Sequence, residues 1–397
     1  MNNTVKISQV IQPYNKNLKI EGDKSLSIRW ALLASQALGK SKSFNLLKSE
    51  DVMSTLKCLK QLGVKVNFNK NFCEIISKGL NGFKYKKKII LDAGNSGTLG
   101  RLLMGLLIHA KNKIKIKGDQ SLSKRDFLRV TKPLEKFGAI FKTNSGKLPI
   151  IINGTKNPKP IYFYENRGSA QCKSSIMFAA LNTPGKTLIK AKKSRDHTEI
   201  LFKQLKIPIK IKKKKKFDLI EVEGKQNFSA FNYKIPSDIS SSAFFIVLTL
   251  LSKESKLTIK NVNLNPSRTG IITILNKMGA KIVLKNKKIY KGEKISDIFV
   301  KSIKSLKAIN CPSNLNASAI DEFLIIFLAA AKAKGISYFK NLSELNEKES
   351  PRLKLGSKIL NMMGIKTILT NDSIKIFGQP NIKLNKNIEI KNYLKDH

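Results

Sequence analysis

Arginine is rare in this chain, and its few positions are the first indication of chemistry. Of the 75 basic residues only eight are arginines, and the others are lysines. The arginines are Arg29, Arg101, Arg125, Arg129, Arg167, Arg195, Arg268 and Arg352. Because lysine supplies most of the positive charge, each arginine is a candidate for work that lysine does poorly, which is two-pronged binding of a phosphate or carboxylate. The alternative for some of them is a surface position or a structural ion pair.

Two of these arginines close a repeated octet. GDKSLSIR stands at 22–29 and GDQSLSKR at 118–125. In the first octet, Ser25 or Ser27 is expected to begin an apolar helix, whose open backbone N–H groups and dipole favour a bound anion. Lys24 adds a full positive charge at the same end of the helix.

Two more segments share this design of a small polar turn before a helix. LDAGNSGTLGRLLMGLL at 91–107 places Arg101 on the expected first helical turn. NRGSAQCKSSIMFAAL at 166–181 leaves Ser169 and Gln171 available to bind hydroxyl or phosphate oxygens. A single glycine-rich turn is a weak signal. Its recurrence together with the octets predicts a site for anionic groups.

Carboxylates with possible chemistry lie in the second half of the chain. Asp321 and Glu322 begin an apolar helix in AIDEFLIIFLAAA, where a carboxylate is more commonly a helix cap than a catalyst. ELNEKESPRLK brings together Lys348, Glu349 and Arg352. This cluster is either a solvated helix end or an acid–base pair beside an anion clamp.

Histidine and cysteine show no metal-ligand spacing. These residues are His109, His197, His397, Cys58, Cys73, Cys172 and Cys311. We expect neither a metal site nor a disulfide, and a reducing cytosol as the compartment. For His197 in SRDHTEILF, capping or packing is favoured over catalysis. The N-terminus lacks the apolar core of a signal peptide, and the longest apolar runs, such as AFFIVLTLL, are too short to span a membrane.

The net charge of +48 would suit a polyanionic partner such as a nucleic acid. Compositional bias is the favoured explanation, because lysine is abundant all along the chain and no aromatic stacking pattern interleaves the basic residues. The densest run, KIKKKKKF at 210–217, is expected to be a solvated hairpin tip, with a polyanion site as the alternative.

A longer repeat indicates the architecture. A helix-like stretch ends in an apolar-x-x-apolar-Gly step and then enters a strand-like stretch. The glycines stand at 63, 138, 279 and 364, and a further copy has Lys206 in that place. The period of roughly 70–85 residues indicates a recurring unit of helices and strands. Three copies precede a domain boundary expected near residue 234 and two follow it, so a sixth unit would lie beyond residue 397.

These segments, in this order, resemble the enolpyruvylshikimate-phosphate (EPSP) synthase family. The resemblance runs from residue 22 to the last residue through GDKSLSIR, GNSGT, GDQSLSKR, GSAQCKS, SRDHTE, PSDISSSAFF, NPSRTG, IDEF and KES-x-R. It implies an α/β (α+β) fold of two domains, 20–234 and 1–19 with 235–397. Each domain would be built from βαβαββ units as an inside-out α/β barrel.

The resemblance also implies an activity. The family transfers the enolpyruvyl group of phosphoenolpyruvate to the 5-hydroxyl of shikimate 3-phosphate and releases phosphate, by addition and then elimination. No metal or organic cofactor is expected. The partners are expected to be these two small molecules, with no specific nucleic acid and no membrane. A monomeric, cytoplasmic enzyme of the shikimate pathway is expected.

The resemblance further implies which residues form the site. Those expected to bind shikimate 3-phosphate are Lys24, Ser25, Arg29, Ser169, Ala170, Gln171, Arg195, Asp321 and Lys348. Those expected to bind phosphoenolpyruvate are Lys24, Gly97, Arg125, Gln171 and Arg352. Asp321 would take the proton of the attacking hydroxyl, and Glu349 with Lys24 would handle the proton at the methylene carbon. Gly97 keeps its turn small, so glyphosate is expected to fit the phosphoenolpyruvate site.

The chain departs from the family pattern in two places. Pro351 replaces an acid in KES-x-R, which affects the ion pairing expected for Arg352. The sequence ends at KNYLKDH, where the family continues with an arginine and a lysine for phosphoenolpyruvate. The sixth unit is therefore expected to be incomplete, and the activity weak or absent.

Three other functions compete with this interpretation. One is the related enolpyruvyl transfer to UDP-N-acetylglucosamine, which uses a catalytic loop cysteine that this sequence does not match. Another is binding of nucleic acid by a basic protein, which would weaken steeply with salt. The last is binding of shikimate 3-phosphate without catalysis.

Overall fold

The computed structural model describes residues 11–347 and 350–382, which divide into two compact units. The three-repeat unit comprises Glu21–Asp238 and Ile289–Lys294. The two-repeat unit comprises the described parts of 1–20, 239–288 and 295–397. Each unit has a hydrophobic core of its own.

These boundaries differ from the expected division near residue 234 at two points. Residues 235–238 belong to the three-repeat unit, because the Ile235 N–H donates to the Phe44 carbonyl and the Asp238 N–H donates to the Glu21 carbonyl. The short segment Ile289–Lys294 also belongs there, with Tyr290 packed against Tyr233.

Every sheet in the described part of the chain has four strands, and these sheets share one strand order. In one repeat, β5 (Ile89–Asp92) is parallel to β6 (Ile114–Lys117), β6 is antiparallel to β8 (Lys147–Asn153), and β7 (Ile140–Asn144) forms a hairpin with β8. The next repeat has the same order in β9 (Tyr162–Glu165), β10 (Lys186–Lys192), β12 (Phe217–Glu223) and β11 (Ile209–Lys213). The lysine run expected at a hairpin tip lies here, where β11 turns into β12.

In two sheets the parallel edge strand comes from a distant part of the chain. In the three-repeat unit, β13 (Asn232–Lys234) pairs with β2 (Leu38–Phe44), followed by β4 (Phe72–Lys78) and β3 (Lys65–Phe68). In the two-repeat unit, β1 (Asn15–Leu18) pairs with β14 (Lys256–Asn263), followed by β16 (Glu293–Lys301) and β15 (Val283–Tyr290). The remaining sheet consists of β17 (Leu306–Lys307), β18 (Ala333–Phe339), β20 (Ile374–Gly378) and β19 (Thr367–Leu369).

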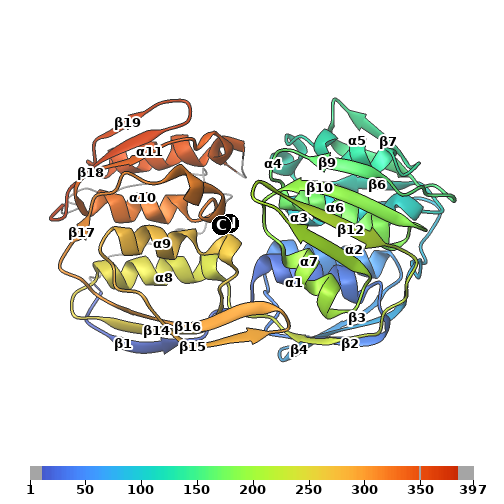
Figure 1. The fold of residues 1–397 in the computed structure, drawn as a ribbon, viewed down its shortest axis with the longest axis horizontal. Coiled ribbons are helices and arrows are strands. Elements are labelled where there is room, and N and C mark those ends of the chain that lie inside the picture. Colours follow the sequence, from blue (N-terminus) through green and yellow to red (C-terminus); the bar gives the residue numbers. More distant parts are fainter. Residues whose placement is uncertain (1–10, 348–349, 383–397) are drawn as a thin grey trace, which may run out of the picture. The chain divides into compact units, whose positions relative to one another are not determined.

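Helices fill the interior of each unit, and the sheets cover it (Figure 1). In the three-repeat unit, nearly every residue is buried in α1 (Lys24–Ala34), α3 (Gly97–Leu106) and α6 (Ala170–Leu181). Such helices need apolar neighbours on all sides. The sheets supply them with one face only, as in β8, where Leu148, Ile150 and Ile152 are buried and alternate with exposed residues.

The remaining helices complete the repeats. They are α2 (Glu50–Gln61), α4 (Gln120–Ser123), α5 (Leu128–Glu135), α7 (His197–Gln204), α8 (Ile239–Leu251), α9 (Gly270–Lys277), α10 (Phe323–Ala331) and α11 (Arg352–Met362). Short 3-10 segments lie at Leu107–His109, Pro266–Arg268, Ser313–Ser318 and Ser343–Glu347. The described chain therefore contains five βαβαββ repeats, three in one unit and two in the other.

The glycine step predicted from the sequence ends the second helix of each repeat. The glycines at 63, 138, 279 and 364 have φ between +81° and +104°, the left-handed region that glycine adopts without steric cost. In the remaining repeat Lys206 holds that conformation at φ +57°. A side chain in the left-handed region costs roughly 1–2 kcal/mol.

We predict that Lys206→Gly raises the free energy of unfolding by about 0.5–1 kcal/mol, because glycine relieves this conformational cost but adds freedom to the unfolded chain. Urea denaturation followed by circular dichroism would measure it. The matched control is Gly279→Ala, whose Cβ would meet nothing nearer than the Lys307 Cγ at 4.0 Å, so it should lose stability through conformation alone. Equal or lower stability of Lys206→Gly would contradict the prediction.

Candidate active site

The repeated octets share one local structure, which is a helix start capped by aspartate. The Asp23 carboxylate accepts from the Leu26 N–H at 2.9 Å, and the Asp119 carboxylate accepts from the Leu122 N–H at 2.7 Å. The expectation that Ser25 or Ser27 begins the first helix was wrong, because Asp23 is the N-cap and α1 begins at Lys24. An aspartate oxygen at this position satisfies a backbone donor that the helix leaves open.

The two octets then diverge, and their arginines take different positions. The first continues as α1, so Arg29 lies inside a long helix. The second ends as the short helix α4 at Ser123, so Arg125 follows the helix end. The same sequence pattern therefore places a buried arginine in one repeat and a half-buried one in the other.

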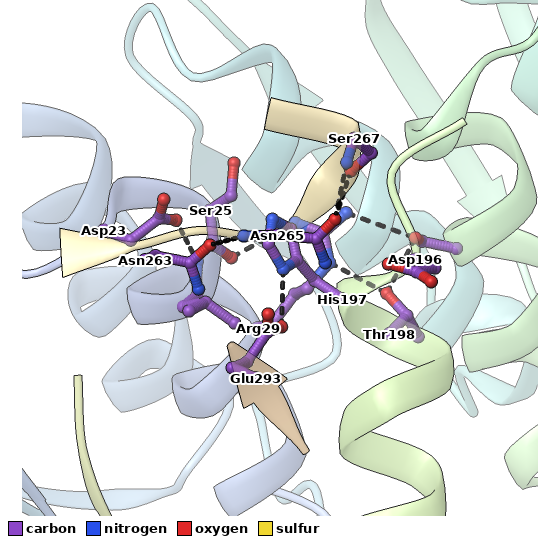
Figure 2. Close-up of polar contacts among 12 residues, drawn as sticks. Asp23, Ser25, Arg29, Asp196, His197, Thr198, Asn263, Asn265, Ser267 and Glu293 are labelled. Atoms are coloured by element: carbon purple, nitrogen blue, oxygen red, sulfur yellow. Dashed lines mark hydrogen bonds and ion pairs between the residues drawn. The ribbon is translucent and has the colours of Figure 1, made fainter. Parts of the chain in front are cut away.

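Arg29 is 2% exposed and joins three helices by hydrogen bonds (Figure 2). Its Nε donates to the Thr198 hydroxyl of α7 at 2.8 Å, and its Nη2 donates to the Ser174 hydroxyl of α6 at 3.2 Å. Its Nη1 donates to the Ser25 carbonyl of α1 at 3.1 Å. These bonds connect the first octet, GSAQCKS and SRDHTE, although Arg29 and Thr198 are 169 residues apart.

His197 has a packing role rather than catalytic geometry. It is the first residue of α7 and is fully buried. Its Nδ1 lies 2.7 Å from a carboxylate oxygen of Glu293, which is also fully buried and belongs to the hairpin between β15 and β16 (Figure 2). This pair fixes the hairpin tip against α7. Arg195 lies two residues earlier, half-buried in the loop between β10 and α7.

The starts of α3 and α6 carry the second group of expected residues. Ser96 caps α3, and Gly97 is its first residue. Ser169 caps α6 by accepting from the Cys172 N–H at 3.2 Å, and Ala170 is the first helical residue. The predicted place of Arg101 on the first turn was off by one residue, since it is the fifth residue of α3.

Two arginine tips converge beside Gly97. A Cβ atom placed on Gly97 would lie 2.9 Å from Nη1 of Arg101 and 3.0 Å from Nη1 of Arg125. Both guanidinium groups therefore border the backbone at the N-terminus of α3, where the helix dipole is positive. Two cations and a helix start favour a bound anion here. Glycine provides the space that this approach needs.

Lys24 stands at the start of α1 close to acidic groups. Its backbone N–H donates to the Asp238 carboxylate at 3.0 Å, and its Nζ lies 3.7 Å from a carboxylate oxygen of Asp51 in α2. Both side chains of this ion pair are partly exposed.

The two-repeat unit brings Asp321 and Arg352 together. Nη1 of Arg352 donates to Oδ1 of Asp321 at 3.3 Å, and the arginine side chain is 2% exposed. Arg352 is the first residue of α11, directly after Pro351. Asp321 is therefore an ion-pair partner of Arg352 in this chain. Lys348 and Glu349 lie outside the described residues.

A second polar cluster in this unit was not predicted from the sequence. Glu322 precedes α10, but its side chain does not cap the helix. Instead its carboxylate accepts from the Ser240 hydroxyl at 2.5 Å, and Nη2 of Arg268 donates to the same hydroxyl at 2.6 Å. NPSRTG and IDEF are thus joined through the helix start of α8. The sequence had singled out Arg268 and Glu322 separately, but not their contact with Ser240.

Thiol and metal chemistry find no support among the described residues. No group of three or more histidine, cysteine, aspartate or glutamate residues there could hold a metal ion. Burial raises the pKa of Cys58, Cys73 and Cys172 to about 12 and that of Cys311 to about 11. A thiol with such a pKa is a poor nucleophile at neutral pH.

None of the helices described is long and apolar enough to cross a membrane.

Known proteins are similar to this chain in sequence and in fold. A family model for EPSP synthase (3-phosphoshikimate 1-carboxyvinyltransferase) matches residues 8–393. The 3-phosphoshikimate 1-carboxyvinyltransferase of Ruthia magnifica subsp. Calyptogena magnifica is 41% identical over 373 residues, 93% of this chain and 84% of that protein. The protein of that description from Caldicellulosiruptor saccharolyticus is 40% identical over 377 residues, 91% of this chain and 86% of its own length. A solved EPSP synthase from Acinetobacter baumannii has a TM-score of 0.81 at 35% identity, covering 92% of this chain and 82% of that one. The expected α/β fold is confirmed.

We predict that Thr198→Val lowers the free energy of unfolding by roughly 1–3 kcal/mol, because the buried Arg29 loses its acceptor at Nε. Thr198→Ser keeps the hydroxyl and is the control. Urea denaturation of the two variants would measure the difference. Equal stability of the valine and serine variants would show that this hydrogen bond does not hold Arg29.

Proposed function

The chain belongs to the EPSP synthase family, and on this premise we propose which of its residues carry the reaction. The enzyme is a transferase that moves the enolpyruvyl group of phosphoenolpyruvate to the 5-hydroxyl of shikimate 3-phosphate, releasing phosphate in the shikimate pathway. It binds both substrates. We further propose that the enzyme is a monomer and that it is located in the cytoplasm.

We propose that the helix starts of the three-repeat unit bind shikimate 3-phosphate. The proposed ligands there are Lys24, Ser25, Arg29, Ser169, Ala170, Gln171 and Arg195. The bonds from Arg29 to Thr198 and Ser174 support this proposal, because they join the three segments that contain these residues. Arginine and small hydroxyl side chains suit the phosphate, carboxylate and hydroxyl groups of this substrate. Asp321 and Lys348 are proposed to complete the set.

We propose that phosphoenolpyruvate binds beside Gly97. The proposed ligands are Lys24, Gly97, Arg125, Gln171 and Arg352. The observation that supports this most is the approach of the Arg125 tip to the backbone of Gly97 at the start of α3, with the charge of Arg101 close by. Phosphoenolpyruvate carries a carboxylate and a phosphate, so it requires several cations at short range.

The proposed chemistry proceeds in two steps. Asp321 takes the proton of the 5-hydroxyl as its oxygen attacks C2 of phosphoenolpyruvate, while C3 gains a proton and a tetrahedral intermediate forms. The intermediate then loses a proton from C3 and the C2–O bond to phosphate breaks, which restores the double bond. Glu349 with Lys24 is proposed to handle the C3 proton. The proposal assigns residues of both units to one reaction.

The rival transfer to UDP-N-acetylglucosamine is disfavoured by the cysteines. That reaction requires a reactive loop thiol, whereas all four cysteines here are buried and have a raised pKa. Binding of shikimate 3-phosphate without catalysis is distinguished from the proposed function by phosphate release.

We predict that Asp321→Asn lowers kcat for phosphate release from shikimate 3-phosphate plus phosphoenolpyruvate by about 10²–10⁴-fold because the base is lost. Binding of shikimate 3-phosphate, measured by calorimetry, should change much less. Glu344→Gln, at an exposed acid of the same unit, is the control. Full turnover by Asp321→Asn would remove the proposed base, and binding without any phosphate release by the unaltered chain would favour the binding-only function.

We predict that Gly97→Ala raises KM for phosphoenolpyruvate about tenfold, a change of about 1.4 kcal/mol, because the new methyl displaces both guanidinium tips. Inhibition by glyphosate should weaken at least as much. The control is Gly100→Ala in the same helix, whose Cβ would meet nothing nearer than the Phe127 ring at 3.4 Å. If both variants kept the KM of the parent enzyme, the phosphoenolpyruvate site would lie elsewhere.

A further inference from the structure

Gln171 is held at both ends of its amide group. Its Oε1 accepts from Nη1 of Arg101 at 2.6 Å, a short distance typical of a charge-assisted hydrogen bond. Its Nε2 donates to the Thr98 hydroxyl at 2.9 Å. All of these side chains belong to the three-repeat unit, from α3 and α6.

The two bonds differ in what they can distinguish. A guanidinium group only donates, so an amide can meet it only through its oxygen. A hydroxyl both donates and accepts, so Thr98 would bond equally well to the amide oxygen or nitrogen. An amide turned by 180° has nearly the same shape, so packing alone does not fix it. Arg101 is therefore the group that selects the orientation of Gln171.

Arg101 is itself firmly placed. It is 4% exposed, whereas Gln171 is only half-buried. Its guanidinium lies over the Phe127 ring, 5.0 Å from the centroid, and its Nη2 donates to the Asp126 carbonyl at 3.4 Å. The Ser175 hydroxyl donates to its backbone carbonyl at 2.8 Å. Stacking and hydrogen bonds from separate elements restrict the side chain to one position.

We propose that Arg101 is a positioning residue that fixes the amide of Gln171 as a hydrogen-bond donor toward the substrates. With the amide oxygen bonded to Arg101 and one N–H bonded to Thr98, the second N–H of Gln171 is the donor directed at the substrates. The phosphate, carboxylate and ether oxygens of the substrates are acceptors, so this orientation favours them and the opposite one would repel them. The inference rests on the proposed function, which makes Gln171 a ligand of both substrates.

The first variants test the hydrogen-bond donor that Arg101 supplies to the amide of Gln171. Arg101→Met retains most of the side-chain volume and removes the donor, and we expect KM for both substrates to rise about 10- to 30-fold. Arg101→Lys still donates to the amide oxygen and should recover most of that loss. Gln171→Glu keeps an acceptor for Arg101 but replaces the N–H with a carboxylate oxygen that also repels the anionic substrates, so it should weaken substrate binding at least as much as Arg101→Met. Thr98→Val should have a clearly smaller effect than Arg101→Met.

A double-variant cycle tests whether Arg101 acts through Gln171. If it does, Arg101→Met added to Gln171→Ala should raise KM no further. Multiplication of the two effects would mean that Arg101 binds substrate directly and would overturn the positioning role. A larger effect from Thr98→Val than from Arg101→Met would overturn it as well.

A spectroscopic readout keeps this inference separate from the proposed function. With ¹⁵N-labelled glutamine, the side-chain amide of Gln171 should give one set of signals in the parent protein and a broadened or doubled set in Arg101→Met. One unchanged set in Arg101→Met would overturn the inference even if the enzyme turns over. Absence of phosphate release by the parent enzyme would remove the proposed function, while the doubled signals would still support the orientation by Arg101.

Discussion

A buried guanidinium group must have hydrogen-bond partners, and in this protein those partners come from other helices. Arg29 on α1 needs hydroxyls from α6 and α7, and Arg101 on α3 needs an amide from α6. An unpaired charge in the core would cost far more than any single apolar contact supplies. The helix starts of different repeats are therefore tied to one another by charge, and the candidate substrate ligands lie on these same starts. Stability and site geometry have a common origin here.

This constraint explains why arginine rather than lysine stands at several buried positions. Arg29, Arg101 and Arg352 are buried and bond through a planar group whose nitrogen atoms point in different directions. A lysine carries all its donors on one atom and reaches a single cluster of acceptors. Among the described residues, Lys173 is the one buried lysine. Its single partner among them is the Glu199 carboxylate, with which it forms an ion pair at 2.5 Å.

The sequence predicted those features that a local pattern encodes. The glycine step marked the end of a helix in every repeat, since a left-handed residue is required at that point, and even Lys206 was found at the right place. The residue that begins α1 was predicted wrongly although its cap is local, since the Asp23 carboxylate accepts from the Leu26 N–H three residues later. The partners of Arg29 and Gln171 were not predictable. Those contacts follow from how helices of separate repeats pack against one another, and no periodicity in the sequence predicts that packing.

The distant edge strands have a consequence for how the protein is made. β1 leaves the ribosome first but pairs with β14, so it must wait for about 240 residues, on the order of ten to fifty seconds of synthesis. The sheet of β2 likewise lacks an edge until β13 at Asn232–Lys234 has been translated. Until then it presents open backbone hydrogen-bonding groups to any passing strand. The nascent chain is thus most exposed to misassembly while the three-repeat unit is nearly complete in length but not yet closed.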